Sequence, residues 1–75
     1  MIKQINQMLN EMVEWASTHD NAEPNLRWIS HRAKWWLCCG NWILSEHEDV
    51  VICVRDGYTK WVEEREQMTL ERKTI

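Results

Sequence analysis

Five side chains in this sequence are of the types that bind metal ions or act as nucleophiles: Cys38, Cys39, Cys53, His31 and His47. Zinc sites use ligand pairs at short spacings such as C-x2-C or H-x3-H, and the sequence contains none of these pairs. A cysteine nucleophile needs a histidine base and an orienting group, and no motif ties these residues together. We therefore expect no catalytic residues, no metal site and no cofactor, and the cysteines are expected to be reduced, buried thiols. The protein is not expected to be an enzyme.

Tryptophan and arginine offer a different chemistry, which is recognition of a partner. Four of the six tryptophans lie between residues 28 and 42, within a segment (25–44) that carries a charge of +3 between two segments of −3. On a helix, Arg32 would follow Trp28 by four residues and precede Trp35 by three, so the guanidinium would lie between two indoles. Tryptophan and arginine are typical of binding hot spots. The predicted partner-binding residues are Arg27, Trp28, His31, Arg32 and Trp35.

Two other interpretations of these tryptophans stay open. Residues 45–75 of the chain, or a second copy in a homodimer, could cover Trp28 and Trp35 as part of a core. Alternatively, a helix-turn-helix-like regulator could use the basic segment on nucleic acid, with the cations on phosphates and the indoles on bases. The net charge of −3 and the bulk of the indoles make nucleic acid the less favoured partner.

The elements that must position these residues are predicted from hydrophobic spacing. Apolar residues between Ile2 and Ala16 recur at intervals of three and four, which predicts an amphipathic helix over residues 2–18. Residues 19–25 form a break. The spacing of apolar residues then predicts a second helix from about Pro24 to Cys39, with Gly40-Asn41 as its left-handed C-cap.

Residues 45–75 fit two structures. Ser45 to Glu48 matches a capping box, and the tail is rich in helix formers, which favours a third helix. A hairpin is the alternative, with strands at 50–55 and 58–62 and a turn at Asp56-Gly57. The expected fold is therefore a small all-α, helical domain of three helices spanning 1–75. The alternative is an α+β fold with two helices on a hairpin or short meander formed by residues 41–63.

Length and charge narrow the class of function. A chain of 75 residues has room for one small domain, and its longest uncharged runs fall far short of the roughly 20 apolar residues that span a bilayer. With no apolar signal region at the N-terminus, we expect a cytoplasmic protein without membrane contact. Small acidic, tryptophan-rich chains without catalytic motifs resemble the accessory proteins of phages and mobile elements. That resemblance implies an inhibitor of a host defence or transcription complex, acting in the host cell by stoichiometric occlusion of a protein surface.

Overall fold

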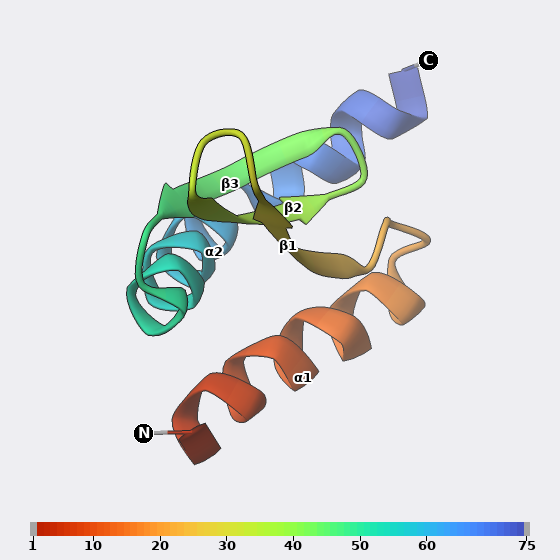
Figure 1. Ribbon diagram of the computed structural model, residues 1–75. Coiled ribbons are helices and arrows are strands. Elements are labelled where there is room, and N and C mark those ends of the chain that lie inside the picture. The colour runs from red at the N-terminus through yellow and green to blue at the C-terminus, as the bar shows by residue number, and fades with distance from the viewer. Residues whose placement is uncertain (1, 75) are drawn as a thin grey trace.

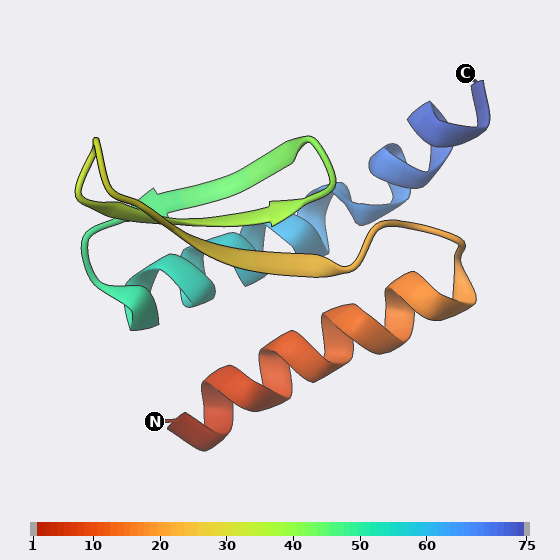
Figure 2. The same ribbon diagram turned by 45° about the vertical axis from the view of Figure 1, so that its right-hand side comes forward.

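Two helices and a three-stranded sheet make up the protein. The structure, a computed structural model, describes residues 2–74, with side chains described for residues 2–67. The elements in chain order are α1 (Ile2–Thr18), β1 (Pro24–Ile29), β2 (Lys34–Cys39), β3 (Trp42–His47) and α2 (Val50–Thr74). The strands form one antiparallel sheet in the order β1-β2-β3. Both helices lie on the same side of this sheet (Figures 1 and 2), so its other face carries no helix within the described chain.

The expected all-α fold, and with it the description of the protein as helical, is wrong. The α+β alternative fits, but of the three strands only β3 lies within the predicted residues 41–63, and β1 and β2 precede them. The segment expected to be the second helix forms β1 and β2, in which Leu26 pairs with Leu37 and Trp28 with Trp35. Aromatic side chains favour the pleated surface of a sheet, and here cross-strand packing outweighs the helical spacing.

Two turns connect the three strands. The turn between β1 and β2 contains backbone hydrogen bonds from Arg32 N to Ile29 O (3.1 Å) and from Ala33 N to Ser30 O (3.2 Å), and Ala33 has a φ of 53°. Between β2 and β3 lie only Gly40 and Asn41, with Gly40 at a φ of 62°. Two-residue hairpin turns need positive φ at their first position, so the pair read as a helix cap is a hairpin turn.

Both observed helices match predicted segments. The helix predicted over residues 2–18 is confirmed as α1, which ends with Asp20 at a φ of 51° and a hydrogen bond from Asn21 N to Ala16 O of 3.0 Å. This pattern is a Schellman cap. The third predicted helix is confirmed as α2, but it begins only at Val50, and Ser45 of the predicted capping box lies in β3. The hairpin with its turn at Asp56-Gly57 is absent from these residues. The cap of α2 is Asp49, whose Oδ1 accepts hydrogen bonds from Val51 N (2.8 Å) and Ile52 N (3.2 Å).

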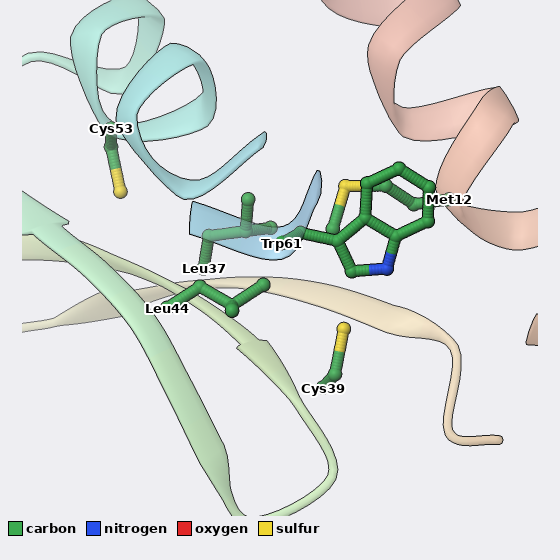
Figure 3. Packing of buried hydrophobic residues seen from close by; sticks show 6 residues of the cluster. All are labelled: Met12, Leu37, Cys39, Leu44, Cys53 and Trp61. Atoms are coloured by element: carbon green, nitrogen blue, oxygen red, sulfur yellow. The ribbon is translucent and has the colours of Figure 1, made fainter. Parts of the chain in front are cut away.

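The core lies between the sheet and the two helices. Its buried cluster is drawn in Figure 3 and consists of Met12, Leu37, Cys39, Leu44, Cys53 and Trp61. Around Trp61, the indole of Trp15 packs edge to face at 5.8 Å between ring centroids, and the guanidinium of Arg65 lies 4.9 Å from the Trp61 ring and 5.9 Å from the Trp15 ring. Tyr58 donates a hydrogen bond from its hydroxyl to Glu11 Oε2 at 2.8 Å, which joins α2 to α1. Aromatic, cation–π and hydrogen-bond contacts therefore join the two helices.

Gly57 allows α2 to lie directly against β2 and β3. A Cβ atom at this position would be 2.4 Å from Leu37 Cδ2 and 2.7 Å from Ser45 Oγ. Ser45 Oγ itself donates a hydrogen bond to Cys53 O at 2.6 Å. The backbone of α2 thus approaches the sheet at a distance that only glycine permits.

A bulge in β3 decides which of its side chains face the helices. Leu37 pairs with Ser45 and Cys38 with Ile43, so Leu44 is the extra residue. Leu44 is buried in the core, and the adjacent Ser45 also contacts α2 through its hydroxyl. The strand therefore directs two consecutive side chains to the helices, whereas Ile43 and Glu46 lie on the other face with their partners Cys38 and Trp36.

Candidate functional site

The helix-free face of the sheet is the candidate site, and we call it the open face. Strand register assigns its members, because residues paired directly across an antiparallel ladder share a face. Arg32, in the turn between β1 and β2, reaches it with its guanidinium. The open face comprises Asn25, Arg27, Ile29, Arg32, Lys34, Trp36, Cys38, Ile43 and Glu46.

Trp36 lies at the centre of the open face. Arg27 is its partner on β1 and Glu46 its partner on β3, so the three side chains form a row across the sheet. The indole Nε1 of Trp36 donates a hydrogen bond to Glu46 Oε2 at 2.6 Å. This bond fixes the ring edge toward β3 and leaves the indole only partly buried. A half-buried, oriented indole is a ready apolar contact for a docking surface.

Glu46 orients two cations of the open face, Arg32 and Lys34. Its Oε2 also accepts from Arg32 Nε at 2.6 Å, and its Oε1 accepts from Arg32 Nη2 at 3.0 Å, a two-point pair. Lys34 Nζ lies 3.9 Å from Oε1. The hydrogen bonds from Arg32 and then from Trp36, with the two nearby cations, lower the pKa of Glu46 from its ordinary 4.5 to about 2. The carboxylate is therefore ionised at neutral pH and orients three neighbouring side chains.

The other end of the open face is apolar. Ile43 on β3 is 45% exposed, and its partner Cys38 on β2 is only 6% exposed. Because no helix of the described chain covers this face, larger neighbouring side chains must cover the thiol. Burial raises the pKa of Cys38, and the nearby charge of Arg27 opposes that shift. Cys38 is thus buried beneath this surface, and Ile43 is the apolar side chain that a partner would reach first.

The residues predicted to bind a partner do not share one surface. Trp28 and Trp35 do meet, at 5.4 Å between ring centroids, but as cross-strand neighbours on the helix side of the sheet. Trp28 is 50% exposed there, whereas Trp35 packs against the core. Arg32 does not lie between the two indoles, because Glu46 holds its guanidinium at the open face. His31 is exposed in the same turn.

Arg27 is the one predicted residue on a strand of the open face, and it is exposed. The predicted partner-binding residues did not include Lys34, Trp36, Ile43 and Glu46. The signal that could have found them is the Gly40-Asn41 turn. Read as a hairpin, it sets a two-residue alternation in β2 that separates Trp36 from Trp35 and Leu37.

The cysteines and histidines do not converge. Cys39 and Cys53 lie in the core and Cys38 on the opposite face, and all three thiols are free. Among residues with described placement, no group of three His, Cys, Asp or Glu side chains is arranged to hold a metal ion. Burial raises the pKa of Cys39 to about 11, which keeps this thiol protonated at neutral pH.

Neither helix, over its described residues, is long and apolar enough to cross a membrane.

Comparison with family models, with curated proteins and with solved structures found no match to this chain.

Proposed function

We propose that the protein binds another protein through the open face and acts by stoichiometric occlusion of the partner's surface. The observation that supports this proposal is a sheet face without a covering helix, on which Trp36 and Ile43 are partly exposed. Exposed apolar side chains framed by charged ones are typical of interaction sites. The turn-anchored pair of Arg32 and Glu46 orders part of this surface before binding, which lowers the entropy lost on association.

A nucleic-acid partner is the second candidate, since Arg27, Arg32 and Lys34 surround an indole. Two features oppose it. Glu46 stands in the same row and would repel phosphates, and its bond to Trp36 keeps one edge of the indole occupied. The chain as a whole has a charge of −3. Affinity for polynucleotides comes mainly from neutralised phosphates, so these features favour a protein partner.

The role of an inhibitor of a host complex, of the kind found among phage accessory proteins, stays part of this proposal. A binder of this size can act without catalysis, because covering a functional surface needs only affinity and one copy per site. The proposal accordingly expects a complex of defined stoichiometry and no turnover.

Affinity capture from lysate of the native host cell tests the proposal with three variants. Ile43→Ser removes exposed apolar surface from the open face, and Val62→Ser is the matched control because Val62 is 43% exposed on α2. We expect the wild type and Val62→Ser to retain the same partner and Ile43→Ser to lose it, with circular dichroism showing that all are folded.

The third variant, Trp28→Ser, tests the predicted partner-binding residues on the helix side of the sheet. Loss of the partner by Trp28→Ser with full retention by Ile43→Ser would contradict the proposal and place the interaction on the helix side of the sheet. Sedimentation of the purified chain would show whether a second copy is the partner.

A further inference from the structure

The open face concentrates positive charge on an otherwise acidic molecule. It carries three cations, Arg27, Arg32 and Lys34, against the single carboxylate of Glu46, a net charge of +2. Because the chain sums to −3, the remaining residues together carry −5. The molecule is therefore strongly polarised, and the field of the open face attracts negative partners whereas the rest of the surface repels them.

The cations of the open face are not equivalent. Glu46 engages Arg32 through both of its oxygens and also lies near Lys34. Arg27, on the opposite side of Trp36, forms no ion pair with another residue of the described chain. An exposed guanidinium presents a planar set of donors that matches a carboxylate in two-point geometry. Arg27 is thus the group best placed to receive a carboxylate from a partner.

Apolar surface lies beside this free cation. Trp36 is the direct cross-strand neighbour of Arg27, and Ile43 lies one strand further on, paired with Cys38. A complementary surface would place an acidic group opposite Arg27 and an aliphatic group against Trp36 and Ile43. A polynucleotide offers the charge but not the aliphatic group, and its phosphates would meet the carboxylate of Glu46.

Resting on the proposed function, we infer that the partner of the open face is an acidic protein surface with aliphatic side chains between its carboxylates. Arg27 binds a carboxylate of that surface, and Trp36 and Ile43 pack on its aliphatic groups. Association is steered by charge and slows as ionic strength rises.

Nuclear magnetic resonance on the full chain, labelled with nitrogen-15, tests this inference with three probes. These are a peptide of alternating Glu and Leu, its Lys and Leu counterpart, and a single-stranded oligothymidylate. The six indole N–H signals provide reporters across the molecule, one of them from Trp36 at the open face. We expect the acidic peptide to shift the signals of Trp36, Arg27 and Ile43, and the basic peptide to leave them unchanged.

Two substitutions define the charge contribution. Arg27→Gln should weaken binding of the acidic peptide about 3- to 10-fold, the range for loss of an exposed charge contact together with its hydrogen bonds. Arg55→Gln is the matched control on α2, at an exposed position away from the sheet, and should leave the affinity unchanged.

Three results would overturn the inference: no shift with the acidic peptide, equal binding of the basic peptide, or tighter binding of the oligonucleotide. These failures are distinguishable from failure of the proposed function. If Ile43→Ser still loses a captured protein while the acidic peptide shows no preference for the open face, that face binds a protein of different charge. If capture is unaffected by Ile43→Ser, the open face itself is not the docking surface.

Discussion

Replacing Gly57 by alanine should destabilise the protein, although alanine is the better helix former. The added Cβ would lie 2.4 Å from Leu37 Cδ2, 2.7 Å from Ser45 Oγ and 3.1 Å from Leu37 Cβ. Leu37 is fully buried, so its side chain has little room to move, and the contact to its Cβ is relieved only by a backbone shift. Overpacking of this kind costs about 1–3 kcal/mol.

Two further terms set the expected size of the effect. If the Ser45 hydroxyl turns away, it loses its 2.6 Å hydrogen bond to Cys53 O, which adds about 1 kcal/mol. Alanine in a helix interior returns about 1 kcal/mol relative to glycine. The net expected destabilisation is about 2 kcal/mol, which corresponds to a fall in melting temperature of roughly 8–16 °C for a domain of this size.

Urea unfolding followed by tryptophan fluorescence measures this free energy. Asp56→Ala, at an exposed position one residue earlier in α2, controls for helix propensity without a contact to the sheet. In a Leu37→Val background, which lacks the Cδ atoms, the cost of Gly57→Ala should shrink, because the closest contact is gone. A Gly57→Ala protein as stable as the wild type, or more stable, would refute the close packing of α2 on the sheet.

Three other outcomes are expected. Ala33→Gly should raise the free energy of unfolding by about 0.5–1 kcal/mol in thermal melts, because Ala33 has a φ of 53° and only glycine adopts it without strain. A loss of stability would contradict that turn geometry. The pKa of Glu46 is held at about 2, below its ordinary 4.5, so its contribution to stability is complete above pH 4.5 and disappears as the pH falls through 2. In nuclear magnetic resonance spectra, the indole N–H signal of Trp36 should move between these two pH values. No movement would argue against the hydrogen bond between Trp36 and Glu46. Tyr58→Phe should cost about 0.5–1.5 kcal/mol in denaturant unfolding by removing the hydrogen bond to Glu11. A double variant with Glu11→Gln should cost less than the sum of the two single variants, and a cost equal to the sum would argue against the bond.

The two helices could be predicted from the sequence because their signals are local. Within each helix, the residues that produce the signal lie only a few positions apart: an apolar stripe in α1 and a run of helix formers in α2. The structure has these helices at Ile2–Thr18 and Val50–Thr74. The hairpin alternative for residues 50–62 failed because Gly57 serves a close approach to the sheet and not a turn. Glycine supports both uses, and only the tertiary structure separates them.

The middle segment could not be read in the same way, because its apolar residues satisfy two periods at once. Leu26, Ile29, Ala33 and Leu37 fall on a helical stripe, whereas Leu26 and Leu37 are also direct partners across two strands. Cross-strand partners are distant in sequence, so the spacing contains no record of them. The surface predicted from a helix therefore combined Trp28 and Arg32, which the sheet and its turn place on different sides.

The bulge at Leu44 makes the length of β3 a constraint in its own right. Deleting Leu44 would restore strict alternation and leave Ser45 and Glu46 opposite Leu37 and Trp36, but it would remove a buried side chain from the core. Deleting Ser45 would instead remove the hydroxyl that is bonded to α2. Insertions in the exposed turn at residues 30–33 would leave the alternation of the strands unchanged, since loops tolerate changes in length, although those that displace Arg32 would break its pair with Glu46. Among descendants of this chain, we expect variation in length to collect in the turn between β1 and β2 and to be excluded from β3.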